Sequence, residues 1–188
     1  MIGSYLKGYE ATRNPKYREV LMAAADSLAT LFNPRVGTLL SWPRNVGTLG
    51  GHNTIIDNMM NLELLFFTGK REYREMAVKH AETTMRNQFR EDGSVCHVAV
   101  YDAATGTHLH NCNHQGFGDE SMWARGQAWA VYGYTMVYRY TKEQRFLDFA
   151  QKVADKMIER LPKDGVPWWD FDDPAIPKAC RDASAGAI

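Results

Sequence analysis

The sequence predicts an all-α protein, an α/α toroid in which helical hairpins form an inner ring of helices wrapped by an outer ring. Three observations predict it. A spacing pattern long enough for one helix occurs three times along the chain. A more apolar predicted helix precedes each occurrence, and longer polar connections join one helix pair to the next. Alternation of fully buried and half-buried helices is typical of this architecture, because the inner helices are covered on both sides.

The repeated pattern places an aromatic residue five positions, and an acid fourteen positions, after a threonine. The threonines are Thr12, Thr68 and Thr141, the aromatic residues are Tyr17, Tyr73 and Phe146, and the acids are Asp26, Glu82 and Asp155. A recurrence of this kind indicates one supersecondary unit used three times, here a turn followed by an amphipathic helix.

Each occurrence supplies the outer helix of a pair. The second and third amphipathic helices are predicted over residues 71–89 and 143–161, and both end at an Asp-Gly turn, Asp92-Gly93 and Asp164-Gly165, where glycine provides a positive φ. The more apolar inner helices are predicted over residues 2–10, 55–67 and 121–140. A helix that is apolar nearly all round is buried on both sides.

These helices define three hairpins, at residues 1–32, 54–90 and 119–161. The connections at 33–53, 93–118 and 164–179 are long, and functional side chains are expected on them. Met1 enters directly into a helix, and residues 181–188 resemble the first turns of another helix. We therefore expect residues 1–188 to be a single partial domain, an internal piece of a larger toroid.

Composition excludes several classes of protein. Lys plus Arg and Asp plus Glu are both 22, so the net charge of zero gives no footprint for nucleic acid or an anionic membrane surface. No stretch reaches the roughly 18 apolar residues of a membrane span. Three cysteines, Cys96, Cys112 and Cys180, are too few for a disulfide framework, and their odd number favours a reducing compartment without deciding the localisation.

Chemistry-bearing residues are densest between positions 113 and 129. Asp119 is predicted to cap a helix N-terminus, with Glu120 complementing the helix dipole. Arg125 and Trp129 are four residues apart and therefore share one helix face. An arginine on a buried helix needs an anion, which could be a ligand carboxylate held by the guanidinium fork or the acid of a structural salt bridge.

A second candidate is Asp57, which lies in an apolar segment predicted as an inner helix. Desolvation raises the pKa of a buried carboxyl, which suits a general acid near neutral pH. A helix cap satisfied by backbone is the structural alternative. Asn58 and Asn61 add amides that could bind hydroxyl groups or orient the carboxyl, so Asn58 is a candidate supporting residue.

A third pattern alternates the possible metal ligands His108, His110, Cys112 and His114. On an extended segment these side chains would point to one side, and zinc prefers such ligands. The spacing is not a common structural-zinc arrangement, so a plain polar loop is the favoured interpretation and no metal or cofactor is expected.

Several motifs together resemble the unsaturated glucuronyl hydrolase family. They are Ile55-Ile-Asp-Asn-Met-Met-Asn-Leu, Asp92-Gly-Ser-Val-Cys-His, His114-Gln-Gly-Phe-Gly-Asp-Glu-Ser, Trp123-Ala-Arg-Gly-Gln-Ala-Trp and Val166-Pro-Trp-Trp-Asp-Phe, followed by the segment from Arg181. The resemblance extends along nearly the whole chain. It implies an (α/α)6 barrel of six hairpins, of which this chain would hold about three.

The resemblance also implies a reaction. The substrate is a lyase-generated oligosaccharide whose non-reducing uronic acid carries a C4=C5 double bond. The enzyme protonates this vinyl ether and adds water, and the resulting hemiketal opens and expels the remaining sugar. The resemblance assigns Asp57 as the general acid and base. The family's second essential aspartate has no match here, so the 188 residues alone are expected to show little activity.

The remaining residues of the motifs are assigned to substrate binding. His97 and Gln115 resemble substrate-holding residues, Arg125 and Trp129 resemble a carboxylate clamp and a ring platform, and Trp42 is similar to a tryptophan of the family's substrate pocket. Asp119 has no assigned role and is a further polar supporting candidate.

Three alternatives stay open. An unsaturated rhamnogalacturonyl hydrolase would share the toroid and the hydration chemistry with a pectin-derived substrate. A catalytically inactive α/α sugar-binding module would bind unsaturated sugars without turnover. A zinc protein would use the histidines and cysteine between positions 108 and 114. The expected partner is an unsaturated uronic-acid oligosaccharide, with no nucleic acid and no membrane, and the oligomeric state is left undetermined.

Overall fold

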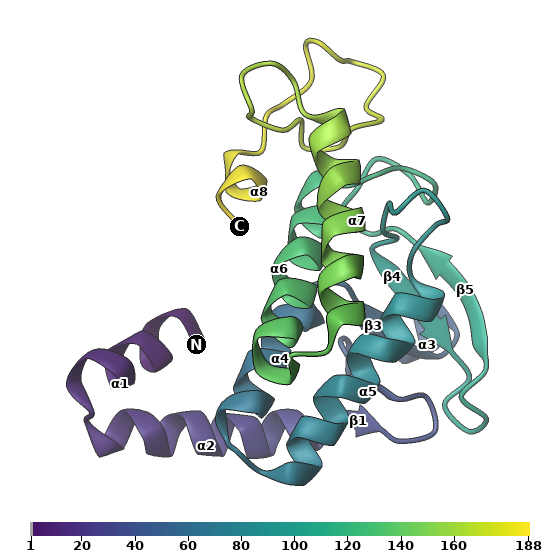
Figure 1. Cartoon of the computed structure of the whole chain (residues 1–188). Coiled ribbons are helices and arrows are strands. Elements are labelled where there is room, and N and C mark those ends of the chain that lie inside the picture. The colour runs from purple at the N-terminus through teal and green to yellow at the C-terminus, as the bar shows by residue number, and fades with distance from the viewer. Residues whose placement is uncertain (1) are drawn as a thin grey trace.

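The computed structural model describes residues 2–188, so the expected helical entry at Met1 lies outside the described residues. The fold is mostly helical (Figure 1). The principal helices are η1 (Ile2–Leu6), α1 (Lys7–Thr12), α2 (Pro15–Ala29), α4 (Asn58–Phe67), α5 (Arg71–Asn87), α6 (Ala124–Thr141) and α7 (Gln144–Arg160). Shorter helices are η2 (Pro43–Asn45), α3 (Val46–Leu49) and α8 (Ala183–Ala187).

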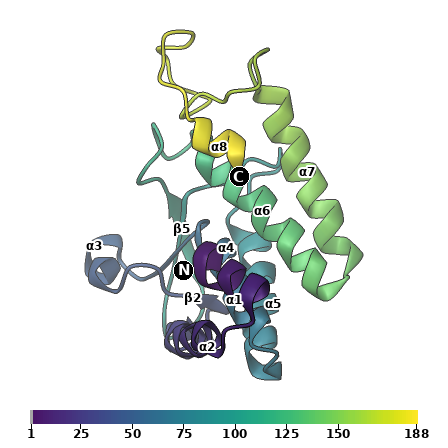
Figure 2. The ribbon, with the colours of Figure 1, turned by 90° about the vertical axis from the view of Figure 1, so that its left-hand side faces the viewer.

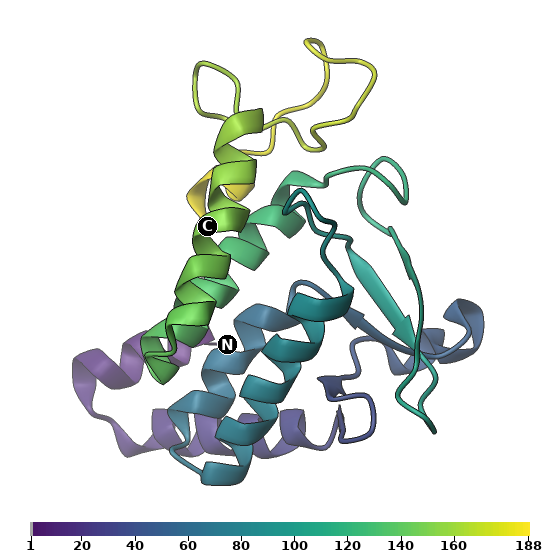
Figure 3. The same ribbon diagram turned by 45° about the vertical axis from the view of Figure 1, so that its right-hand side comes forward.

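Consecutive helices pack in pairs. α4 lies against α5 and α6 against α7, with α4 and α6 in contact between the pairs (Figure 3). The predicted outer helices, 71–89 and 143–161, match α5 and α7 to within two residues at each end. The turns that follow have the expected positive φ, +88° at Gly93 and +74° at Gly165. α8 forms in the segment expected to start another helix, and it packs on α6 (Figure 2).

Two of the three repeated acids, Asp26 and Glu82, link one helix pair to the next. Asp26 on α2 accepts hydrogen bonds from Lys70 Nζ at 2.6 Å and from the Tyr73 hydroxyl at 2.7 Å, where α5 begins. Glu82 on α5 accepts one from Arg145 at 2.7 Å, where α7 begins. Exposed ion pairs contribute roughly 0–1 kcal/mol each. These two acids therefore indicate that neighbouring helix pairs pack in the same way, and they add little to the free energy of unfolding.

The core lies between the inner helices α4 and α6 and the outer helix α5. Met59, Leu62 and Leu65 on α4 are fully buried, as is Tyr134 on α6. The Tyr134 hydroxyl donates to the carbonyl oxygen of Ala81 at 2.9 Å, so its polar end is satisfied inside the core. α4 and α6 approach closely because Gly133 has no side chain where it faces Met59.

The expectation of an all-α chain is wrong in the connections. β3 (His52–Ile55), β4 (Val98–Tyr101) and β5 (His108–Cys112) form an antiparallel sheet in the order β3-β4-β5. β1 (Phe32–Asn33) and β2 (Thr38–Leu39) form a second, two-stranded ribbon. β4 is buried at every position, so it lacks the alternation that marks a half-buried strand.

Two inner helices begin three residues later than predicted. Residues 55–57 belong to β3 and a turn, so α4 begins at Asn58. Residues 121–123 are likewise not helical, with Trp123 extended, and α6 begins at Ala124. In both cases the apolar residues directly before the helix, Ile56 and Met122 among them, are buried. No helix among residues 2–188 is long and apolar enough to cross a membrane.

The close approach of α4 and α6 predicts an unusual sign for one substitution. Alanine normally stabilises a helix interior over glycine by about 1 kcal/mol. At Gly133 an added Cβ would overlap the Met59 Cβ, so Gly133→Ala should lower the free energy of unfolding by about 1–3 kcal/mol. Urea denaturation measures this. Gly47→Ala in α3, where a Cβ meets nothing within 4 Å, is the matched control and should not destabilise. Equal effects of the two substitutions would contradict this account.

Candidate active site

The sheet and the inner helices bring separated segments to one place. Asp57 lies in the turn between β3 and α4, and His97 lies directly before β4. The backbone N–H of Ile56 donates to the carbonyl oxygen of His97 at 3.0 Å, which holds these two segments together. Arg125 and Trp129 occupy the first two turns of α6. Four of the predicted site residues thus converge from three parts of the chain.

Asp57 occupies the N-cap position of α4 but does not cap it, because its side chain accepts no hydrogen bond from the helix backbone. The side chain is only 18% exposed. Its Oδ2 atom is buried, with no hydrogen-bond partner among residues 2–188. Burial is the largest influence and raises the pKa of Asp57 to about 6, against the opposing effects of its own backbone, the Arg125 charge and the Trp129 indole. The carboxyl can therefore carry a proton near neutral pH.

His97 faces Asp57 as a buried neutral ring. Its Nε2 lies 3.6 Å from Asp57 Oδ2. Burial, with the nearby His114, lowers the pKa of His97 to about 4. Nδ1 accepts the backbone N–H groups of His114 and Gln115, each at 3.2 Å. Because Nδ1 is the acceptor, the hydrogen of the neutral ring is assigned to Nε2, the nitrogen that faces Asp57.

Two further predicted residues border this ring. Gln115 Nε2 lies 3.4 Å from His97 Nε2, and the residue is otherwise exposed. With hydrogen on His97 Nε2, the Gln115 amide is assigned the flipped orientation, in which its oxygen faces the ring. The Trp42 ring stands edge-on to His97 at 5.8 Å and to His114 at 5.0 Å between ring centroids. Asn53 exchanges two hydrogen bonds with the backbone of Trp42, which fixes that tryptophan beside β3. Gln115 is exposed and Trp42 is half-buried, so each keeps some solvent-accessible surface beside His97.

Arg125 is the cation of the site. Its side chain is 38% exposed, and its Nε lies 3.7 Å from Asp182 Oδ2. The guanidinium also lies 5.2 Å from the centre of the Trp123 ring. A pair this long and this exposed is weak, so the guanidinium keeps donors for a ligand carboxylate. Trp129, four residues further along α6, is half-buried near Asp57.

Two predicted supporting residues have other roles. Asn58 is buried, and its amide donates to Leu39 O, Ser41 Oγ and Thr54 Oγ1, so it ties the β2 segment to α4 and does not orient Asp57. The prediction that Asp119 caps a helix is wrong, because α6 begins at Ala124. Asp119 is exposed, and its Oδ1 accepts the backbone N–H of Asn113 at 2.7 Å, closing the loop between them.

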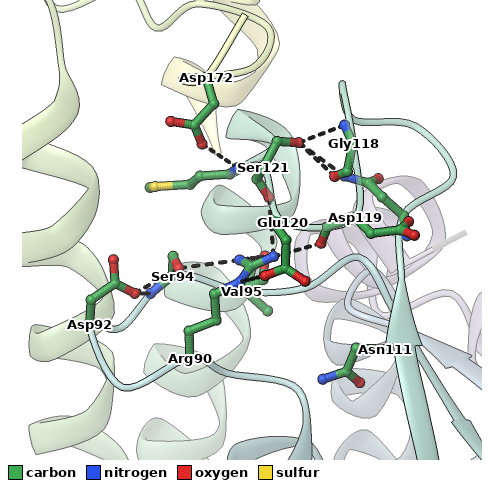
Figure 4. A network of polar contacts seen from close by, with 12 residues as sticks. Arg90, Asp92, Ser94, Val95, Asn111, Gly118, Asp119, Glu120, Ser121 and Asp172 are labelled. Atoms are coloured by element: carbon green, nitrogen blue, oxygen red, sulfur yellow. Dashed lines mark hydrogen bonds and ion pairs between the residues drawn. The ribbon is translucent and has the colours of Figure 1, made fainter.

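Arg90 holds the end of that loop at Asp119 (Figure 4). One Nη atom donates to the carbonyl oxygen of Asp119 at 2.8 Å, and the other donates to the hydroxyl of Ser94 at 3.2 Å. Glu120 lies 3.6 Å from the Arg90 guanidinium. The turn after α5 and the loop before α6 are therefore held together by one side chain.

Among the fully buried polar residues that the sequence did not single out, two hold segments around α6 in place. Asp170 accepts the Phe117 backbone N–H at 2.8 Å and the Ser121 hydroxyl at 2.7 Å. Gln127 donates to the carbonyl oxygens of Gly93 and Val153, both at 3.0 Å, and so links α6 to α7. Gln127 lies in the Trp123–Trp129 motif, which is a signal that could have found it. Asp170 likewise lies in the motif of residues 166–171, but that motif alone assigned it no role.

The zinc alternative gains no geometric support. His108, His110 and Cys112 do lie on an extended strand, β5, but His108 Nε2 is 2.9 Å from Asn111 Oδ1, and His114 lies beside Trp42. Within the described part of the chain, no three His, Cys, Asp or Glu side chains are arranged to hold a metal ion.

Comparisons with known proteins agree with the motifs. No model of a protein family matches the chain. The chain is 49% identical over 181 residues to the unsaturated glucuronyl hydrolase of Formosa agariphila, covering 93% of this chain and 45% of that protein. It is 34% identical over 189 residues to the unsaturated chondroitin disaccharide hydrolase of Streptococcus pyogenes, covering 98% and 47%.

The fold agrees as well. The crystal structure of the unsaturated glucuronyl hydrolase of Bacillus sp. GL1, named as responsible for the degradation of glycosaminoglycan, matches with a TM-score of 0.90 at 35% identity. The match covers 97% of this chain and 49% of that chain. The chain spans about half the length of the curated relatives it matches.

The burial of Asp57 predicts a pH-dependent stability. The folded chain holds this proton more tightly than the unfolded chain does, so stability falls as the pH rises from 3.8 towards about 6. Asp57→Asn removes the buried charge and should raise the free energy of unfolding at about pH 8 by up to about 3 kcal/mol, with little gain at about pH 4. Thermal unfolding of the protein measures the difference. Asp155→Asn on the exposed face of α7 is the control, and an equal gain there would contradict this origin.

Proposed function

This chain belongs to the unsaturated glucuronyl hydrolase family, and we propose that the protein containing it removes the 4,5-unsaturated uronic acid from the non-reducing end of lyase-generated oligosaccharides. We propose also that residues 1–188 form one partial domain, about three of the six hairpins of an (α/α)6 barrel. The observation that carries the function is the buried Asp57 carboxyl with its raised pKa, placed beside a neutral histidine and near the partly exposed guanidinium of Arg125.

Asp57 serves as proton donor and then as base. Its protonated carboxyl gives the proton to C4 of the C4=C5 double bond, and positive charge develops at C5 and the ring oxygen. Water then adds at C5 and returns a proton to the Asp57 carboxylate, which restores the acid. The C5 hemiketal opens and expels the rest of the oligosaccharide. One water is consumed, and no covalent bond to the protein forms.

The neighbouring side chains bind and orient the sugar. Arg125 receives the uronate carboxylate, because its guanidinium keeps unused donors beside Trp123. Trp129 offers a ring face to the pyranose. His97 donates from Nε2, while Gln115 and Trp42 border the same ring and contact the sugar. Each role uses a side chain close to Asp57 and needs no cofactor.

The direct test follows the loss of ultraviolet absorbance from an unsaturated chondroitin disaccharide. The full-length gene product should consume the disaccharide, and Asp57→Asn should reduce kcat by at least about 100-fold, since removal of a general acid or base typically costs about 10²–10⁴-fold. Asp155→Asn should retain full activity. Thermal unfolding of both variants checks that they fold.

Other outcomes would replace the proposal. Turnover only of a pectin-derived unsaturated disaccharide would favour a rhamnogalacturonyl hydrolase. Binding of unsaturated disaccharides without turnover would favour an inactive sugar-binding module. An active Asp57→Asn variant would place the proton donor elsewhere.

Arg125 provides a second test. Arg125→Gln removes a charged hydrogen-bond donor worth about 1.5–3 kcal/mol and should lower kcat/KM by about 10- to 100-fold, mainly through KM. Arg139→Gln at the exposed end of α6 is the matched control. A substrate whose uronate is a methyl ester should bring wild type and Arg125→Gln close together. If the variant loses equally on the ester, Arg125 does not bind the carboxylate.

A further inference from the structure

The ring of His97 is held by backbone groups of an exposed loop. Nδ1 accepts the N–H groups of His114 and Gln115, and both residues are exposed to solvent. The ring itself is 2% exposed and packs 4.7 Å from the Trp123 ring, centroid to centroid. While the loop stays in place, Nδ1 must act as an acceptor, so the neutral ring carries its hydrogen on Nε2. If the loop moves, this restriction is lost.

The carboxylate of Asp170 holds this loop in place through hydrogen bonds. It is fully buried, and its Oδ2 accepts the Phe117 backbone N–H at 2.8 Å and the Ser121 hydroxyl at 2.7 Å. Its Oδ1 accepts the backbone N–H of Asp172 at 3.0 Å, which fixes the carboxylate to its own segment. Gly116 passes so close that an added Cβ would lie 2.8 Å from Asp170 Oδ2. One carboxylate thus clamps the loop on both sides of its tip.

We propose that Asp170 is a positioning residue that, by clamping the loop of residues 113–121, locks His97 in the tautomer with hydrogen on Nε2. This inference rests on the proposed function of Asp57 as proton donor. The proposed role is separate from substrate binding: fixing the tautomer prevents His97 from accepting the proton that Asp57 must give to the substrate.

The reason is the identity of the nitrogen 3.6 Å from Asp57. With hydrogen on Nε2, the ring presents a donor to the carboxyl and cannot accept its proton. If the loop detaches, Nδ1 loses two donors and can carry the hydrogen itself. Nε2 would then present a lone pair to Asp57 and compete with C4 of the substrate for the proton. Detachment should therefore slow protonation while leaving the ring platform and the cation in place.

Two variants test the clamp in the full-length protein. Asp170→Asn removes an acceptor at the clamp. Gly116→Ala keeps the Asp170 carboxylate but crowds it and the Asn113 amide, which pushes the loop away. Asp173→Asn is the matched control from the same segment. Within residues 2–188, the Asp173 carboxylate accepts hydrogen bonds only from the Trp169 indole and the Ala175 backbone N–H. Nitrogen NMR of ¹⁵N-histidine-labelled protein reads the His97 tautomer directly, with a His97→Gln spectrum for assignment.

Wild type and Asp173→Asn should show hydrogen on Nε2 alone. Asp170→Asn and Gly116→Ala should show hydrogen on Nδ1 or a mixture, and kcat should fall by about 10- to 100-fold, the scale of a displacement of about 1 Å at a reacting group. KM should rise by a smaller factor than kcat falls, because the loop also carries Gln115, one of the proposed substrate contacts. An unchanged tautomer in a folded Asp170→Asn or Gly116→Ala protein overturns the proposal, and so does a changed tautomer with unchanged kcat.

The two proposals can fail separately. The tautomer is measured without substrate, so a wild-type protein that shows the Nε2 form but consumes no unsaturated uronide would refute the proposed function and leave the clamp intact. Wild-type turnover with hydrogen on Nδ1 would refute the clamp and leave the function intact. If Asp170→Asn does not fold, Gly116→Ala decides alone.

Discussion

The arrangement depends on one costly burial, that of the Asp57 carboxyl where β3 turns into α4. An acid side chain at a helix N-cap ordinarily accepts backbone N–H groups and is stabilised as a carboxylate. Asp57 accepts none from its helix, and its Oδ2 has no partner within residues 2–188. Desolvation therefore prevails over the nearby Arg125 charge, and the pKa rises to about 6. The sheet serves this constraint because the Ile56–His97 backbone bond places a neutral ring against the carboxyl.

The pKa values of Asp57 and His97 move in opposite directions for one physical reason. Burial disfavours the charged form of each group, which raises the acid to about 6 and lowers the histidine to about 4. Between these values both groups are neutral, and the hydrogen on each must be placed by geometry. Arg125 carries a permanent charge and is more exposed, so it can meet an anionic sugar without adding a buried charge to the core. The site thus separates proton transfer from anion binding.

The sequence predicted helices better than strands, and it predicted candidate reactive residues better than the polar residues that hold loops in place. α5 and α7 were found because their apolar residues recur with helical period over long segments. β4 was missed because it is short and buried at every position, so its strand period is hidden. Asp57, Arg125 and Trp129 could be named from motif and spacing. Asp170 lies in the motif of residues 166–171, but only the fold shows that its carboxylate is fully buried and holds a loop while its neighbour Asp172 is exposed.

The most direct measurement is the titration of the Asp57 carboxyl by carbon NMR, with ¹³C-labelled aspartate and Asp57→Asn for assignment. The account predicts a midpoint near the value of about 6 that burial imposes, well above the ordinary 3.8. A positive charge brought close to Asp57 Oδ2 should lower the titration midpoint of this carboxyl, because an opposite charge favours the carboxylate. A midpoint at or below the ordinary value would show that the carboxyl is ionised at neutral pH, and Asp57 could not then serve as the proton donor.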